Sequence, residues 1–217
     1  MMMHNLGKKG SLLNQYIAEL RDVNIQKDSM RFRRNMERVG EIFAYEISKT
    51  LEWEEKEVIT SLGSANCLVL KNQPVIATIL RAGLPMHQGI LRFFDQAENA
   101  FISAFRKHHK NGRFDIQVEY TSSPDITNKV LILSDPMLAT GSSMVLSYKE
   151  LIRKGIPRHT HFVSAVASVQ GIEFLKKNIV REKYSLWVGA VDDELTAQAY
   201  IVPGLGDAGD LAFGSKL

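Results

Sequence analysis

The fold is decided by the stretch Lys129-Val-Leu-Ile-Leu-Ser-Asp135-Pro-Met-Leu-Ala-Thr140-Gly141-Ser142-Ser143. Residues 130–133 are apolar whichever way they face, which is typical of a parallel-sheet strand that helices cover on both sides. Asp135 comes just after the carboxyl end of this strand, where open α/β sheets bind their ligands. The stretch therefore predicts a buried strand, a ligand-binding loop and a helix.

The loop after Asp135 has the composition of a phosphate cradle. Residues 140–143 bring three hydroxyl groups and one glycine to the start of the predicted helix. The first turn of a helix offers N–H groups without intrahelical partners and the positive end of the helix dipole, so it can hold a phosphate. Gly141 permits the positive φ or the close backbone approach that such a cradle needs. A carboxylate beside a phosphate cradle indicates a phosphorylated sugar as the ligand.

Both features have plainer explanations. An acid after a strand often caps a turn or the next helix, and a serine or threonine at a helix start is a common cap. Capping is disfavoured for Asp135, because Pro136 and several further residues separate it from the helix. The hydroxyl residues lie between this acid and the helix start, which favours a binding loop over an ordinary cap.

Three blocks of the sequence resemble the uracil phosphoribosyltransferase family. Asp135-Pro-Met-Leu-Ala-Thr-Gly141 is similar to that family's phosphoribosyl-pyrophosphate (PRPP) motif. Ile79-Leu-Arg-Ala-Gly-Leu84 resembles its pyrophosphate-binding loop, and Tyr200-Ile-Val-Pro-Gly-Leu-Gly-Asp-Ala-Gly-Asp210 its uracil-binding segment. The blocks occur in the family's order, and the resemblance covers roughly residue 20 to the end. It implies an α/β type I phosphoribosyltransferase fold, with a central parallel sheet flanked by helices and a small hood or hairpin.

The resemblance also implies an activity. Uracil and PRPP would give UMP and pyrophosphate in pyrimidine salvage, with Mg²⁺ as the cofactor and no direct metal ligand from the protein. Many phosphoribosyltransferases carry two adjacent acids in the PRPP motif, whereas this chain has Pro136 at the second position, as the uracil family does. The single carboxylate of Asp135 would favour the positive charge that develops on the ribose in the transition state.

Residue roles follow from the matching motifs. The implied catalytic residues are Asp135, Arg106 and Asp207. The implied PRPP-binding residues are Arg81, Arg106, Asp135, Pro136, Met137, Leu138, Ala139, Thr140, Gly141, Ser142, Ser143 and Asp207, and the implied uracil-binding residues are Ile201, Gly206, Asp207 and Ala208. Considered alone, Arg81 reads as a surface arginine, and Arg106 as the start of a solvated basic loop that ends at Lys110.

The spacing Gly204-Leu-Gly206-Asp-Ala-Gly209 matches the dinucleotide fingerprint G-x-G-x-x-G. The motif lies at the end of the chain, and we expect no room for the helix, second strand and ribose-binding acid that the fingerprint needs. A tight glycine loop can instead present backbone groups to the edge of a flat base. The nearby acids Asp192, Asp193 and Glu194 are interpreted as a solvated turn, with a water-mediated Mg²⁺ contact as the alternative.

Length and composition favour one soluble domain over residues 1–217, with residues 1–10 flexible. The chain has 217 residues, 45% of them hydrophobic and 24% charged, and its net charge is only +3. Such a charge is weak support for a nucleic-acid partner. A single cysteine cannot form an internal disulfide, and we expect Cys67 to be a small buried side chain. With no apolar run long enough for a membrane span, a cytoplasmic protein is expected.

Hydrophobic periodicity predicts alternating strands and helices after residue 70. We expect helices over 11–20, 29–51, 85–94, 143–154 and 170–178, and strands over 74–80, 100–106, 113–120, 129–134, 161–167 and 186–191. The strand at 113–120 alternates apolar and polar residues and should form one arm of a solvent-facing hairpin. The long helix over 29–51 is a plausible interface of a homo-oligomer, a dimer or larger.

Other functions are compatible with the same fold. One is a pyrimidine-responsive regulator that binds RNA, which would need a clustered basic face. A second is a catalytically silent paralogue, suggested by the unusual loop after Arg106 and by Ser142. A third, a purine or orotate phosphoribosyltransferase, is disfavoured by the 200–210 block.

Overall fold

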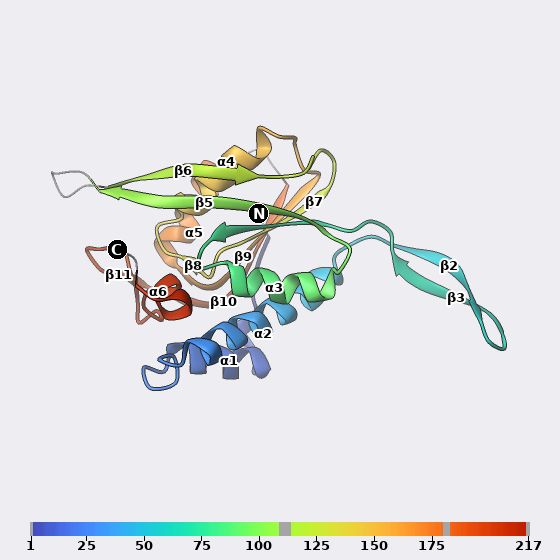
Figure 1. The fold of residues 1–217 in the computed structure, drawn as a ribbon, viewed down its shortest axis with the longest axis horizontal. Coiled ribbons are helices and arrows are strands. Elements are labelled where there is room, and N and C mark those ends of the chain that lie inside the picture. Colours follow the sequence, from blue (N-terminus) through green and yellow to red (C-terminus); the bar gives the residue numbers. More distant parts are fainter. Residues whose placement is uncertain (1, 109–113, 180–182, 216–217) are drawn as a thin grey trace.

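The computed structural model describes residues 2–108, 114–179 and 183–215, and it describes no side chain between residues 104 and 118. The chain forms an α/β fold around one large sheet, in which the strands lie in the order β1-β10-β9-β7-β4-β5-β6 (Figure 1). These strands are β1 (Met2–Asn5), β4 (Val75–Leu80), β5 (Glu98–His108), β6 (Phe114–Ser122), β7 (Val130–Ser134), β9 (His159–Ser168) and β10 (Tyr184–Asp192). Neighbouring strands run parallel except β5 and β6, which form the predicted antiparallel hairpin.

Helices cover both faces of the sheet and enclose two hydrophobic clusters. One face carries α1 (Leu12–Arg21), α2 (Ser29–Ser48) and α3 (Leu84–Phe93), and the other carries α4 (Ser142–Ile152) and α5 (Val169–Asn178). Ile132 of β7 packs in the first cluster, whereas its neighbours Leu131 and Leu133 pack in the second. The expectation of a strand that is apolar on both faces is therefore confirmed. No helix in the described ranges is long and apolar enough to span a membrane.

The parallel register brings the carboxyl ends of the central strands to one edge. Thr78 of β4 pairs with Ser134 of β7, and Ser134 pairs with Val163 of β9. The buried hydroxyl groups of Thr78 and Ser134 each donate across the two strands, to the carbonyl oxygens of Ser134 and Ala77 at 3.3 and 3.2 Å. The loops that follow β4 and β7 therefore start side by side.

The first residues of the chain differ from the sequence prediction. The segment predicted to be flexible, residues 1–10, contains β1, which pairs in parallel with β10 at the edge of the sheet. The His4 ring stacks on Trp187 with 3.8 Å between ring centroids. The predicted first helix is confirmed as α1, and Ser11 and Asn14 form a reciprocal capping box at its start.

A second antiparallel hairpin was not predicted. Strands β2 (Trp53–Thr60) and β3 (Gly63–Leu70) pair only with each other, and they project from the body of the molecule (Figure 1). Almost all of their residues are exposed, so neither face carries the burial pattern of a sheet packed on a core. Cys67, which we expect to be buried, is exposed on β3, because this strand has no layer of the protein against it.

Candidate functional site

Asp135 leaves the carboxyl end of β7, and β9 fixes its backbone. The Asp135 N–H donates to the Val163 carbonyl at 3.0 Å, and the Asp135 carbonyl accepts from the Ser164 hydroxyl at 2.6 Å. The Met137 N–H lies 3.5 Å from one carboxylate oxygen of Asp135. These contacts hold the acid at the edge of the sheet where a ligand was predicted.

The loop after Asp135 is anchored to the junction between β9 and α5. The short strand β8 (Met137–Leu138) pairs with Val166 and Ala167 of β9. The Ser168 hydroxyl donates to the Ala139 carbonyl at 2.6 Å and accepts from the Gly171 N–H at 2.8 Å. Sequence reasoning missed Ser164 and Ser168, because their strand also contains His159, Thr160 and His161 and no pattern singles the two serines out.

Gly141 shapes the predicted phosphate cradle. Its φ is +79°, and a Cβ built on it would lie 2.8 Å from the Gly171 carbonyl oxygen. A side chain at this position would therefore meet both backbone strain and a collision. The helix α4 starts directly after it, with the hydroxyl groups of Thr140 and Ser142 at 3.2 Å from each other. The amides of the first turn and these hydroxyls gather at one place, as a phosphate site requires.

Arg81 follows β4 and reaches the C-terminal segment. Its guanidinium donates to the Gly214 carbonyl at 3.1 Å and lies 3.6 Å from an oxygen of Asp210. The Leu80–Arg81 peptide bond is cis. Arg106 lies in β5, where its backbone pairs with Ile116, but its side chain is outside the described part of the chain. The structure thus places Arg81, and only the backbone of Arg106, relative to the other candidates.

The C-terminal segment is folded against the core and is not a loose glycine-rich tail. Strand β11 (Glu194–Leu195) pairs with β12 (Ile201–Val202), and α6 (Ala208–Phe213) follows. The Asp207 carboxylate caps α6 by accepting from the N–H groups of Gly209 and Asp210 at 2.9 and 3.0 Å. A short helix therefore does follow the G-x-G-x-x-G spacing, contrary to our expectation. No strand follows α6 up to residue 215, where the description ends, so no second βαβ strand supports the dinucleotide interpretation.

These elements place the three sequence blocks around one edge of the sheet, and the comparisons with known proteins agree. The family described as uracil phosphoribosyltransferase matches residues 8–215. A uracil phosphoribosyltransferase from Porphyromonas gingivalis is 54% identical over 213 residues, which cover 98% of each chain. The chain belongs to the uracil phosphoribosyltransferase family. The family and enzyme class predicted from the sequence are confirmed.

More distant similarities extend over most of the chain as well. A uracil phosphoribosyltransferase from Thermococcus gammatolerans is 36% identical over 206 residues, which cover 94% of this chain and 89% of the relative. A solved structure from Aquifex aeolicus is 27% identical, covers all of both chains and superposes with a TM-score of 0.87. The similarity to family members thus extends over nearly the whole chain, including the N-terminal helices.

The C-terminal segment of residues 200–210 has a support that the sequence did not reveal. Asp192, interpreted as part of a solvated turn, is buried at the end of β10 and forms a bidentate ion pair with Arg21 of α1. That interpretation is wrong for Asp192, although its neighbours Asp193 and Glu194 are exposed. The two partners are 171 residues apart, so no local pattern links them.

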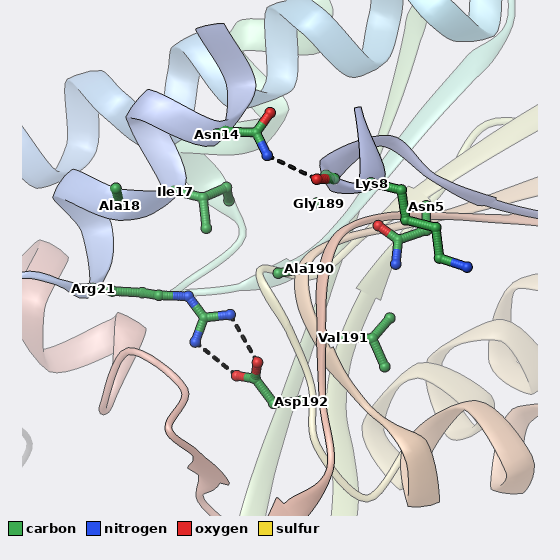
Figure 2. A pocket seen from close by; sticks show the side chains of 11 residues that line it. Asn5, Lys8, Asn14, Ile17, Ala18, Arg21, Gly189, Ala190, Val191 and Asp192 are labelled. Atoms are coloured by element: carbon green, nitrogen blue, oxygen red, sulfur yellow. Dashed lines mark hydrogen bonds and ion pairs between the residues drawn. The ribbon is translucent and has the colours of Figure 1, made fainter. Parts of the chain in front are cut away.

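A pocket of about 390 Å³ opens beside this ion pair. It lies between the N-terminal residues, including the short helix η1 (Leu6–Lys8), the helix α1 and the strand β10. Figure 2 shows Arg21 and Asp192 facing each other at its wall. None of the predicted PRPP-binding or uracil-binding residues lines it. The site of the family reaction is therefore argued from the loops at the sheet edge and not from this pocket.

Electrostatics distinguish Asp135 from the other acids. The residue is only partly exposed, and burial raises the pKa of its carboxyl group to about 7, although the Met137 N–H lowers the pKa slightly. The carboxyl group is thus poised between its two protonation states near neutral pH. A ligand that brings positive charge to this edge would favour the carboxylate form.

The raised pKa predicts a pH-dependent stability. An unfolded Asp ionises near pH 4 and native Asp135 near pH 7, so the native state binds more protons between these values. The contribution of Asp135 to the free energy of unfolding should therefore fall as pH rises from about 5 to about 7. Asp135→Asn cannot titrate, so its stability relative to wild type should rise over this range, as measured by urea unfolding at each pH.

The exposed neighbour provides the matched control. Asp193→Asn should follow the wild-type pH dependence, because Asp193 is exposed to solvent. Parallel wild-type and Asp135→Asn curves between pH 5 and 7 would contradict the raised pKa.

Proposed function

We propose that this chain transfers the phosphoribosyl group of PRPP to uracil and gives UMP and pyrophosphate. N1 of uracil attacks the anomeric carbon of the ribose and loses its proton, and the bond from this carbon to the pyrophosphate oxygen breaks. The observation that carries the proposal is the meeting of the PRPP loop, Arg81 and the 200–210 segment at one sheet edge, in a chain matched by the family over residues 8–215.

The PRPP loop suits the 5′-phosphate and the ribose. The amides at the start of α4, with the hydroxyl groups of Thr140, Ser142 and Ser143, form the phosphate cradle. Asp135 lies at the other end of the same loop, where its carboxylate can accept hydrogen bonds from ribose hydroxyls. Its negative charge would stabilise positive charge that develops on the ribose.

Arg81 and Arg106 suit the pyrophosphate. Arg81 emerges from β4 next to the start of the PRPP loop, because Thr78 pairs with the residue before Asp135. A guanidinium presents several donors to phosphate oxygens, and a charge-assisted hydrogen bond contributes about 1.5–3 kcal/mol. Mg²⁺ typically binds through substrate phosphates and retains several waters, so we propose that PRPP carries the ion into the site. The ion would neutralise the departing pyrophosphate.

The C-terminal segment suits uracil. Backbone N–H and C=O groups of Gly206 and Asp207 lie in the turn between β12 and α6, and Ala208 begins α6. Uracil presents two acceptor oxygens and an N3–H donor, which such alternating backbone groups can pair. A base with an amino group in place of an oxygen would leave a buried donor unpaired and would be rejected.

We also propose that the chain forms a homo-oligomer and that the β2–β3 hairpin takes part in the contact. An isolated two-stranded hairpin is marginally stable in water. This one nevertheless exposes large apolar side chains, with Ile59 88%, Leu62 98% and Leu68 68% exposed. Burial of these side chains against a second copy would stabilise both the hairpin and the assembly.

The first experiment measures nucleotide formation from PRPP with Mg²⁺ and each of four bases. Uracil should give UMP, whereas cytosine should give no product because its amino group does not fit the hydrogen-bonding pattern described above. Orotate and hypoxanthine should also give no product, because orotate carries an extra carboxylate beside N1 and hypoxanthine carries a second ring. No product from any base, with a folded protein that still binds PRPP, would contradict the proposal. Salt-dependent RNA binding in that case would indicate the regulator on the same fold.

Substitutions test the site within the active protein. Asp135→Asn and Arg106→Ala should lose most turnover while the fold persists, and the loss for the arginine should be about ten- to a hundredfold or more in kcat/KM. Asp193→Asn and Arg153→Ala are matched controls on exposed side chains and should stay near wild type. Circular dichroism checks the fold, and near-wild-type turnover in both site variants would overturn the residue assignment.

The hairpin is tested by oligomeric mass. The double variant Ile59→Glu/Leu62→Glu should sediment as a smaller species than wild type, since charged side chains would be buried at the contact. Leu12→Glu, on an exposed position of α1, is the control and should keep the wild-type mass. An unchanged mass of the double variant would remove the hairpin from the interface.

A further inference from the structure

One ion pair holds the 200–210 segment, to which we assign uracil binding above. Arg21 ends α1 and Asp192 ends β10, and their two hydrogen bonds measure 2.7 and 2.9 Å (Figure 2). Asp192 is 8% exposed and the Arg21 side chain 23%. Parallel N–H···O bonds of a guanidinium to a carboxylate fix geometry as well as charge. The pair therefore fixes the end of α1 relative to the end of β10 more narrowly than a single hydrogen bond would.

Both partners also bind the same residue of the 200–210 segment. Arg21 donates to the Gly204 carbonyl at 3.0 Å, and the Gly204 N–H donates to Asp192 at 2.9 Å. Both backbone polar groups of Gly204 are thus occupied by one ion pair. This glycine has a φ of +55°, and a Cβ built on it would lie 2.1 Å from the Ile201 carbonyl oxygen. The backbone at Gly204 is held in a conformation that only glycine tolerates.

The held residue stands directly before the turn that suits uracil. Gly206 is two residues further along the chain. Leu205 before it and Ala208 after it are 3% and 4% exposed, and both pack in the hydrophobic cluster that contains residues of α1 and α2. Buried side chains allow little sliding, because protein interiors are close-packed. A shift at Gly204 is therefore passed to the backbone groups of residues 206–208.

We propose that Arg21 and Asp192 are positioning residues for base recognition, a role that rests on the proposed function of residues 206–208. The pair does not touch the reacting atoms. It holds Gly204 so that the backbone donors and acceptors beyond it match the edge of uracil. Its loss should weaken the use of uracil more than the use of PRPP, because only Asp207 of the predicted PRPP-binding residues lies in the 206–208 segment and the PRPP loop is anchored separately by Ser164 and Ser168.

Arg21→Lys is the main test, because it keeps the positive charge and removes the bidentate hydrogen bonds to Asp192. The KM for uracil should rise about tenfold or more, and the KM for PRPP should change less than about twofold. Asp192→Asn should also raise the KM for uracil. The double variant should be less than additive, because both changes break one contact. Arg153→Lys is the matched control, since Arg153 also contacts both carboxylate oxygens of a glutamate, but on the surface.

The outcomes separate the inference from the function on which it rests. If wild type forms no UMP, the proposed function fails first. If wild type is active and folded Arg21→Lys shows an unchanged uracil KM, or an equal rise in both KM values, the positioning role is wrong and the pair is structural. Asp192→Asn removes one partner of a buried ion pair and can unfold the chain, so Arg21→Lys decides in that case.

Discussion

The constraint on which this structure depends is the burial of a parallel sheet on both faces. Helices occupy both sides, so side chains that point out of the strands have no access to a ligand. Chemistry is confined to the edge where the strands end, and the parallel register of β4, β7 and β9 brings those ends together. Loops that are far apart in the sequence therefore share one site.

The loops that form the candidate site are held in place by hydrogen bonds from buried and partly buried polar side chains. Ser164 and Ser168 of β9 hold the loop after Asp135, and the ion pair of Arg21 and Asp192 holds the 200–210 segment at Gly204. Each anchor has its own hydrogen-bond partners inside the protein, so each loop is fixed independently. Such pre-organisation is what positioning catalysis requires, because reacting groups must lie within a narrow range of geometries.

The sequence was informative where structure is local. The strand, loop and helix around Asp135 follow from adjacent residues, as does the capping box at Ser11. It was uninformative where structure depends on distant partners. Asp192 looks like a surface acid until α1 supplies Arg21, and β1 looks like a loose end until β10 supplies an edge. The exposed β2–β3 hairpin carried no burial pattern to read.

Arg81 has partners within the chain itself. Its guanidinium donates to the carbonyl of Gly214 and faces the carboxylate of Asp210, so the chain's own C-terminal segment occupies a donor that suits pyrophosphate. A phosphate oxygen that binds Arg81 would replace the hydrogen bond to Gly214. The net binding free energy would then be only the difference between the two hydrogen bonds. Under the proposed role of Arg81, Asp210 and Gly214 would be internal competitors for the ligand. If Arg81 binds pyrophosphate as proposed, these internal partners would ease product release, since the arginine would return to a carbonyl and a carboxylate and not to bare solvent.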